Sequence, residues 1–320
     1  MGDTTFYYLS YQAANEALEN NDLINAMTEF FWTIEMGEYG DPYGFGEREF
    51  IETQNDAINK YRELAKKIDT PILSKTSFIQ GCQCQKLIWL YKYKYNKQVI
   101  SEETKSKFKR GNIIGDLAQH LFPNSVDIIK IVEPNTKYTI DQSLRHMPTY
   151  LKQQLWLRET QKLLAAAEYN QICEAAFMYD KVYSAIDILT IENDKRIAYE
   201  VKSVTKINDV HIKDSALQYY VINNNLPLSD FYLIYINEEY LNSLNMPMQD
   251  LTLENCDINQ LFKRESIIDE VKNLQPYIKE NIDKFKLILK NRNKEPVIKS
   301  GAQCDTPYEC AFKRYCNVRR

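Results

Sequence analysis

Polar and apolar residues alternate along three successive segments in the middle of the chain. These segments are QICEAAFMY from Gln171, SAIDILTI from Ser184 and RIAYEVKSV from Arg196. A period of two predicts β-strands. The polar stretch Glu192-Asn193-Asp194-Lys195 between the second and third segments predicts a turn. The last two strands are therefore expected to form a β-hairpin.

Apolar residues recur at helical spacing on both sides of these strands. Helices are expected near residues 75–95, 103–122, 148–169, 210–223 and 267–291, with a further strand, DFYLIYI, at 230–236. The order strand, strand, strand, helix, strand predicts an α/β fold, with a sheet flanked by helices. The first seventy residues predict two or three helices, at roughly 9–36 and 48–68. A boundary at Thr70-Pro71 separates this helical extension, residues 1–70, from a domain at 71–320.

Charge is distributed unevenly along the 320 residues. The chain has a net charge of −4, but residues 1–70 hold 14 acids and 5 bases, and the remainder has a net charge of +5. The acidic extension is therefore not expected to contact DNA. Two roles remain open for it, docking of a protein partner and a purely structural extension. No apolar run is long enough to span a membrane and no secretory signal begins the chain, so a cytoplasmic location is expected.

The hairpin carries an acid on one strand and an acid-x-lysine triplet on the next. Asp187 lies near the end of the first strand, and Glu200 and Lys202 share one face of the second. Two carboxylates can hold a divalent metal beside an ammonium group, as metal-dependent phosphodiester hydrolysis requires. The alternative is a solvated cross-strand ion cluster. The apolar flanking residues disfavour that alternative, because a carboxylate on a buried strand needs a metal or another partner.

The same triplet occurs twice elsewhere, in a different context. Glu103-Thr104-Lys105 and Glu270-Val271-Lys272 lie in segments with helical spacing, and neither follows a strand that carries an acid. Context therefore singles out Glu200.

Seven cysteines, an odd number, favour metal ligation over a disulfide framework. Cys304, Cys310 and Cys316 are separated by five residues each. A fourth thiolate, from Cys82 or Cys84, would complete a zinc site or a four-iron cluster, and the spacing does not separate these two possibilities. Cys173 is expected in the core, and Cys256 carries little information.

Lysines and aromatic residues alternate between residues 86 and 110. Eight basic residues lie among four aromatic ones: Lys86, Lys92, Lys94, Lys97, Lys105, Lys107, Lys109 and Arg110, with Trp89, Tyr91, Tyr93 and Tyr95. Such a segment suits backbone neutralisation and base stacking on a single strand. A solvated amphipathic helix explains the pattern equally well.

Four separated segments together resemble a known family. They are LSKTSFIQGCQCQKLIWL, the strands with Asp187 and Glu200-Val201-Lys202, the helix DSALQYYV, and the tail GAQCDTPYECAFKRYC. They resemble the RecB-like PD-(D/E)xK nucleases with a C-terminal iron–sulfur staple, which include CRISPR-associated exonucleases and AddB-type helicase–nuclease subunits. The likeness covers about residues 72–320 and is strongest to a bacterial branch catalogued as a domain of unknown function. It implies a restriction-endonuclease-like core whose ends are joined by a cysteine-ligated cluster.

The resemblance also implies roles for individual residues. A [4Fe–4S] cluster would be held by Cys84, Cys304, Cys310 and Cys316, with Cys82 a bystander. Magnesium or manganese would be bound by Asp187, Glu200 and the backbone carbonyl of Val201, and Lys202 would orient or deprotonate the attacking water. Gln218 would help to position DNA, with Tyr219 beside it, because Ile222 stands where relatives have a tyrosine.

Two acids complete the expected site. Many relatives carry a metal-binding histidine where this chain has Gly115. Asp116 is the favoured replacement, with His120 as the alternative. Glu174 is either a further acid of the site or a charge at a strand end.

The expected function is a metal-dependent DNA nuclease, an exonuclease on single-stranded or frayed ends. Two alternatives stay open. One is a catalytically inactive nuclease fold that binds DNA or a protein partner, and the other is an RNA- or nucleotide-directed enzyme of the same fold.

Overall fold

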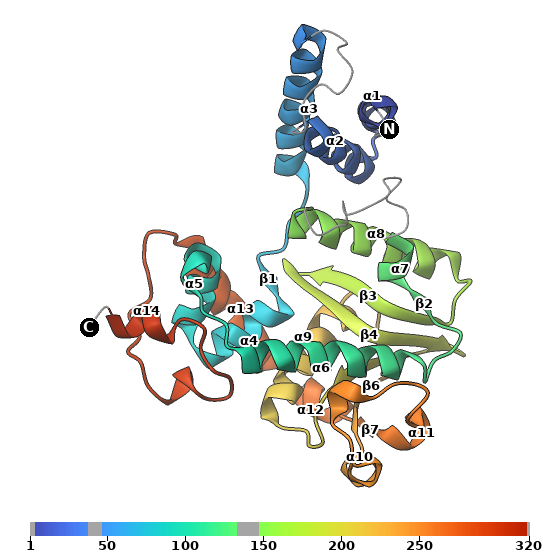
Figure 1. The fold of residues 1–320 in the computed structure, drawn as a ribbon, viewed down its shortest axis with the longest axis vertical. Helices are drawn as coiled ribbons and strands as arrows, with labels where there is room; N and C mark the ends of the chain where they lie inside the picture. Colours follow the sequence, from blue (N-terminus) through green and yellow to red (C-terminus); the bar gives the residue numbers. More distant parts are fainter. Residues whose placement is uncertain (1–3, 38–46, 133–146, 319–320) are drawn as a thin grey trace. The chain divides into compact units, whose positions relative to one another are not determined.

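The computed structural model describes residues 4–37, 47–132 and 147–318 (Figure 1). The chain divides into two compact units, residues 1–70 with 135–155, and residues 71–134 with 156–320. The predicted boundary at Thr70-Pro71 did not include residues 147–155 in the first unit. Residues far apart in sequence contact each other there, since the hydroxyls of Tyr61 and Tyr150 lie 2.7 Å apart.

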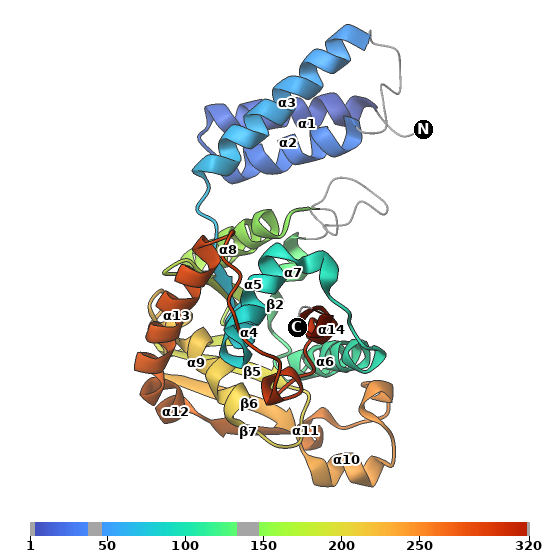
Figure 2. The ribbon, with the colours of Figure 1, turned by 90° about the vertical axis from the view of Figure 1, so that its left-hand side faces the viewer.

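The first unit contains three helices that lie side by side (Figure 2). They are α1 (Thr4–Glu19), α2 (Leu23–Gly37) and α3 (Glu47–Lys67). Apolar side chains of α2, including Phe30, are buried between them. The expected helix at 9–36 is two helices, because Asn21 has a left-handed backbone with φ of 57°. The glycine-rich segment expected between the helices, at 38–46, lies outside the described residues.

The second unit is built on a seven-stranded mixed sheet, which confirms the α/β class. The strands are β1 (Leu73–Ser74), β2 (Val126–Asp127), β3 (Gln171–Tyr179), β4 (Val182–Glu192), β5 (Lys195–Lys202), β6 (Asp230–Ile236) and β7 (Phe262–Ser266). Their order is β2-β3-β4-β5-β6-β7, and β1 pairs with β4. The pairs β1–β4, β2–β3 and β5–β6 are parallel, and the others are antiparallel.

The predicted hairpin is formed by β4 and β5. Its two turn residues, Asn193 and Asp194, have φ of 48° and 64°, the left-handed conformation that a tight hairpin turn requires. Pairing runs from the turn as far as Ile188 and Tyr199 and then stops. Beyond that point the far end of β4 pairs with β1 instead. The sheet therefore opens between β4 and β5 next to Asp187.

The rest of the described chain contains further helices, some of which cover the sheet. They are α4 (Lys75–Gln83), α5 (Gln85–Tyr93), α6 (Glu102–Gln119), α7 (Ile128–Val132), α8 (Thr149–Ala166), α9 (Asp209–Asn223), α10 (Glu238–Leu244), α11 (Ile258–Leu261), α12 (Ile268–Asn273), α13 (Gln275–Lys290) and α14 (Lys313–Val318), with short 3-10 turns at Tyr95–Lys97, Met248–Asp250 and Ala302–Cys304. The expected helix at 75–95 is broken at Cys84, where the backbone is extended. The expected helix at 267–291 is broken at Leu274, shortly before Pro276. Both competing Glu-x-Lys triplets lie in helices, as predicted.

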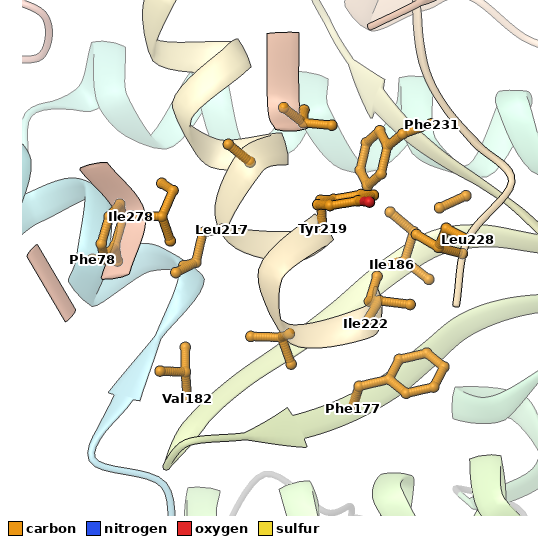
Figure 3. Close-up of a cluster of buried hydrophobic side chains, with 14 of the residues drawn as sticks. Phe78, Phe177, Val182, Ile186, Leu217, Tyr219, Ile222, Leu228, Phe231 and Ile278 are labelled. Carbon is orange, nitrogen blue, oxygen red and sulfur yellow. The ribbon is translucent and has the colours of Figure 1, made fainter. Parts of the chain in front are cut away.

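Two apolar cores lie on opposite faces of the sheet. Helices α4, α9, α12 and α13 pack on one face, and the core there includes Ala198 of β5 and Leu217 of α9. Figure 3 shows part of this core, with Ile222 of α9 facing the strand that carries Ile186. Helix α6 packs on the other face, against Tyr199 and its neighbours. The successive residues Ala198 and Tyr199 thus face different cores, as the alternating pattern predicts. None of the helices in the described ranges has the length and apolar character needed to cross a membrane.

Candidate functional site

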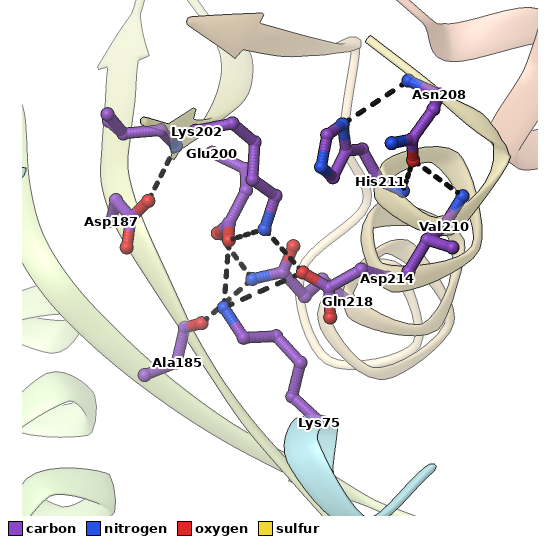
Figure 4. Close-up of polar contacts among 11 residues, drawn as sticks. Lys75, Ala185, Asp187, Glu200, Lys202, Asn208, Val210, His211, Asp214 and Gln218 are labelled. Carbon is purple, nitrogen blue, oxygen red and sulfur yellow. Dashed lines mark hydrogen bonds and ion pairs between the residues drawn. The ribbon is translucent and has the colours of Figure 1, made fainter. Parts of the chain in front are cut away.

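Charged side chains from four elements meet where β4 and β5 separate (Figure 4). Asp187 comes from β4, Glu200 and Lys202 from β5, and Gln218 from α9. Two residues that sequence reasoning missed join them, Lys75 at the start of α4 and Asp214 of α9. Their distances and burial show what the cluster can do.

Glu200 is the centre of the cluster and is only 2% exposed. Its Oε1 accepts hydrogen bonds from Lys202 Nζ at 2.6 Å and Lys75 Nζ at 2.8 Å. Its Oε2 accepts a third, at 2.6 Å, from the Gln218 amide, which also donates to the carbonyl of Ala185 at 3.1 Å. Burial alone would raise the pKa of Glu200, but the two ammonium groups lower it to about 2. The carboxylate is therefore charged and fully partnered.

Gln218 was expected to help position DNA, but its side chain does not reach the surface. It is completely buried, and its amide donates to Glu200. A buried carboxylate needs such donors to offset its desolvation.

Lys202 donates to a second carboxylate, Asp214 Oδ2, at 2.5 Å. Burial lowers the pKa of this lysine, but Asp214 and Glu200 more than compensate and raise it above its ordinary value. Lys202 is thus an ammonium at neutral pH. In this form it can orient a water or stabilise negative charge.

Asp187 lies in the gap between the strands. Its Oδ2 accepts a hydrogen bond from the backbone N–H of Val201 at 2.6 Å, in place of the strand pairing that has ended. Burial and then the charge of Glu200 raise the pKa of Asp187 to about 7. A cation placed between these carboxylates would reverse that shift.

Glu174 is a further acid of this cluster. It lies in the interior of β3, not at a strand end, and its backbone is left-handed with φ of 58°. Burial and then the nearby Asp187 raise its pKa to about 8. Asp127 of β2 also raises the pKa of Glu174 and is therefore close to it. Several carboxyl groups thus share a partly buried site, which favours a bound cation or proton.

The donors in this cluster suit a hard cation. Carboxylate and carbonyl oxygens are the usual ligands of magnesium and manganese. Within residues 4–37, 47–132 and 147–318, however, no three histidine, cysteine or acidic side chains are grouped so as to hold a metal ion. This holds for the acids of the cluster, where both oxygens of Glu200 accept from donors of the protein, and for the cysteines described below.

Three expected residues lie outside the cluster. Asp116 is exposed on α6, and so is His120, the C-cap of that helix. The buried side of α6 consists of Ile114, Leu117 and Ala118. Tyr219 is 7% exposed and packs in the core near Phe231 (Figure 3). The predicted metal-binding role of Asp116 and the DNA-positioning role of Tyr219 are therefore not supported by their positions. Sequence alone did not orient either helix about its axis.

The four expected cluster cysteines line a shared pocket. Cys84 comes from the break between α4 and α5, and Cys304, Cys310 and Cys316 come from the C-terminal tail. Burial and then the neighbouring thiols raise the pKa of Cys310 to about 11, so it is a neutral thiol. Cys82 does not line this pocket and accepts a hydrogen bond from the Tyr277 hydroxyl at 3.7 Å.

The other two cysteines lie elsewhere. Cys173 is buried in the core, as predicted, and Cys256 donates to the carbonyl of Thr252.

Aromatic residues of the basic segment pack inside the second unit. Trp89 is buried and its indole N–H donates to the carbonyl of Asn291 at 3.0 Å. Tyr91 packs against Phe312, and the Tyr93 hydroxyl donates to the carbonyl of Leu289. The base-stacking interpretation is therefore wrong for Trp89, because its ring is not accessible.

One of the two missed residues left a signal in the sequence. Asp214 precedes Gln218 by four residues, so the two share a face of a helix that was predicted. Lys75 left none, because its partner Glu200 is 125 residues away.

Comparison with known proteins adds little to this geometry. No family model matches the chain, and no curated protein matches it. Among solved structures, the chain is similar to one described as "Crystal structure of SSO0001", with 13% sequence identity and a TM-score of 0.27. The likeness covers 67% of this chain and 97% of the other. At that TM-score it carries no argument about fold or function.

Proposed function

We propose that the second unit is a metal-dependent DNA nuclease with a restriction-endonuclease-like, RecB-like core. The single observation that carries this proposal is the convergence of Asp187, Glu200 and Lys202 where β4 and β5 separate. The mixed sheet with helices on both faces is compatible with such a core. The preferred substrate is single-stranded DNA or a frayed end, cut by an exonuclease in the cytoplasm.

The residues of the cluster have different roles in this proposal. Magnesium or manganese, held by Asp187, Glu200 and the carbonyl of Val201, would neutralise the phosphate and lower the pKa of the attacking water. Lys202 donates a hydrogen bond to that water or to the phosphate oxygen on which negative charge develops. Gln218 and Asp214 keep Glu200 and Lys202 in place through the hydrogen bonds described above.

The cysteine pocket supports a structural [4Fe–4S] cluster. Four thiols from distant parts of the chain line it, and thiolates are the ligands that such a cluster needs. Its role would be to join α5 to the C-terminal tail, with no part in the hydrolysis. Zinc is the alternative, and iron and zinc analysis of anaerobically purified protein separates the two.

The decisive experiment follows Mn²⁺-dependent degradation of end-labelled DNA. We expect cleavage by the wild type and a loss on the order of 10²- to 10³-fold in Lys202→Ala. Lys279→Ala is the matched control, because Lys279 pairs with Asp283 on the exposed side of α13. Equal activity of the wild type and Lys202→Ala would refute the site. If unlabelled RNA inhibits the cleavage more strongly than unlabelled DNA does, the preferred substrate is RNA.

A specific observation favours one second candidate, a nuclease fold that binds DNA or a protein without cutting. Both oxygens of Glu200 are occupied by side chains of the protein itself. Calorimetry with Mn²⁺ tests this candidate. Binding that is lost in Asp187→Asn supports the enzyme, and no binding to the wild type supports the inactive module.

The first unit is proposed to serve the enzyme through protein contacts. Residues 1–70 carry 14 acids and 5 bases, which disfavours binding to DNA and leaves a partner-docking or structural role. Deleting residues 1–70 should therefore leave the affinity for DNA unchanged.

A further inference from the structure

Lys75 stands at an unusual place for a lysine. It is the first residue of α4, directly after the N-cap Ser74, whose side chain and that of Ser77 form a capping box. The amino end of a helix carries partial positive charge, which disfavours a cation there. A lysine in this position therefore needs an external carboxylate, and Glu200 supplies it at 2.8 Å.

The two lysines of the cluster are held with different strength. Lys202 has two short contacts, at 2.6 Å to Glu200 and 2.5 Å to Asp214, and its side chain is 16% exposed. Lys75 has one short contact, and its distance to Asp214 is 4.0 Å. Its side chain is also more exposed, at 30%. Of the two ammonium groups on Glu200 Oε1, that of Lys75 is the easier to displace.

We propose that Lys75 is a placeholder cation that neutralises Glu200 in the absence of metal, leaves it when a divalent metal binds, and then contacts the substrate phosphate. This inference rests on the proposed function of the same site. It assigns to Lys75 two successive partners, a carboxylate of the protein and an oxygen of the substrate.

Charge explains why the exchange is expected. Glu200 is buried, and the ammonium of Lys202 is shared between Glu200 and Asp214, so in the metal-free protein Lys75 supplies the second positive charge for these two carboxylates. A divalent cation supplies the same neutralisation and repels an ammonium on the same oxygen. Lys75 therefore has to move once the metal arrives.

The anchor of Lys75 sets where the released ammonium can go. The capping box at Ser74 and Ser77 fixes the start of α4, and the flexible four-carbon stem moves about that fixed point. Lys75 also interacts electrostatically with Asp187 and Asp214, so its ammonium lies close to these two acids as well as to Glu200. A phosphate bound beside these acids is the nearest new anion, and lysine binds phosphate well.

Calorimetry with Mn²⁺ alone, without DNA, tests the first step. Lys75→Gln removes the competing charge, so we expect Mn²⁺ to bind on the order of tenfold more tightly than to the wild type. Lys75→Arg keeps the charge and should bind Mn²⁺ like the wild type. Lys279→Gln, in an ion pair outside the site, should also be unchanged. Thermal unfolding of metal-free Lys75→Gln should occur at a lower temperature, with a larger stabilisation by added Mn²⁺ than in the wild type.

Turnover on DNA at saturating Mn²⁺ tests the second step. We expect kcat to fall on the order of 10²-fold in Lys75→Gln, although the metal binds more tightly. Unchanged or weaker Mn²⁺ binding by Lys75→Gln overturns the placeholder role, since a purely structural lysine would lower stability and affinity together. Tighter binding with an unchanged kcat overturns the contact with phosphate. A wild type that neither binds Mn²⁺ nor cuts DNA overturns the proposed function as well, whereas an active wild type indistinguishable from Lys75→Gln overturns this inference alone.

Discussion

The acid–lysine cluster around Glu200 and the cysteine pocket around Cys304 are both assembled from distant parts of the chain, but they differ in how they are held together. In the first, carboxylates are matched by ammonium and amide donors of the protein itself. In the second, thiols lie beside apolar side chains such as Leu87 and Phe312. The charge of Glu200 is therefore matched by donors of the protein, whereas the neighbouring Asp187 and Glu174 have raised pKa values. The second is held by the packing of its thiols against these side chains.

The largest expected effect follows from substituting a cysteine of the pocket. Because the proposed cluster joins α5 to the C-terminal tail, Cys304→Ser should lose iron and lower the free energy of unfolding by about 4 kcal/mol. Urea unfolding followed by circular dichroism, with iron analysis of the same sample, measures both. Cys256→Ser is the matched control, since Cys256 lies away from the pocket. Unchanged stability of Cys304→Ser would remove the contrast between the two sites.

Asp187→Asn should have the opposite profile, with loss of activity and intact stability. We expect Mn²⁺-dependent cleavage to fall on the order of 10²- to 10³-fold, because a proposed metal ligand is lost. The free energy of unfolding without metal should not fall, since burial and the charge of Glu200 already disfavour the ionised Asp187. Iron content should match that of the wild type. Activity equal to the wild type in this variant would contradict the proposed site.

The smallest effect sharpens the comparison inside the acid–lysine cluster. Gln218→Met keeps the length of the side chain but removes the donor to Glu200 Oε2. The free energy of unfolding should fall by about 1.5–3 kcal/mol, the usual contribution of a hydrogen bond to a charged group. Urea titration at neutral pH measures the change. No measurable loss would mean that the two lysines alone satisfy Glu200.

Local pattern was sufficient for the elements that carry the site. Period-two alternation predicted β3, β4 and β5, and the polar residues around Asn193 predicted the hairpin turn. The same alternation correctly placed Glu200 and Lys202 on one face. These predictions succeed because strand pairing and side-chain alternation depend on residues only a few positions apart.

Rotation of helices and long-range partners were not predictable in the same way. Asp116 was expected in the site and is exposed, and Tyr219 was expected to face a substrate and lies in the core. Lys75 was missed, although it contacts Glu200 directly. These outcomes depend on which side of a helix meets the sheet. Helix α9 is buried on most of its sides, so its pattern alone does not select one.

The sequence by itself determined the α/β class, the hairpin and the chemical types of side chain at its end. Tertiary structure alone decided that β4 leaves β5 beside Asp187, that Lys75 enters the gap from α4, and that Gln218 holds Glu200. The physical reason is one of range. Backbone pattern is local, whereas neutralising a buried carboxylate requires donors that only the folded chain brings within hydrogen-bonding distance.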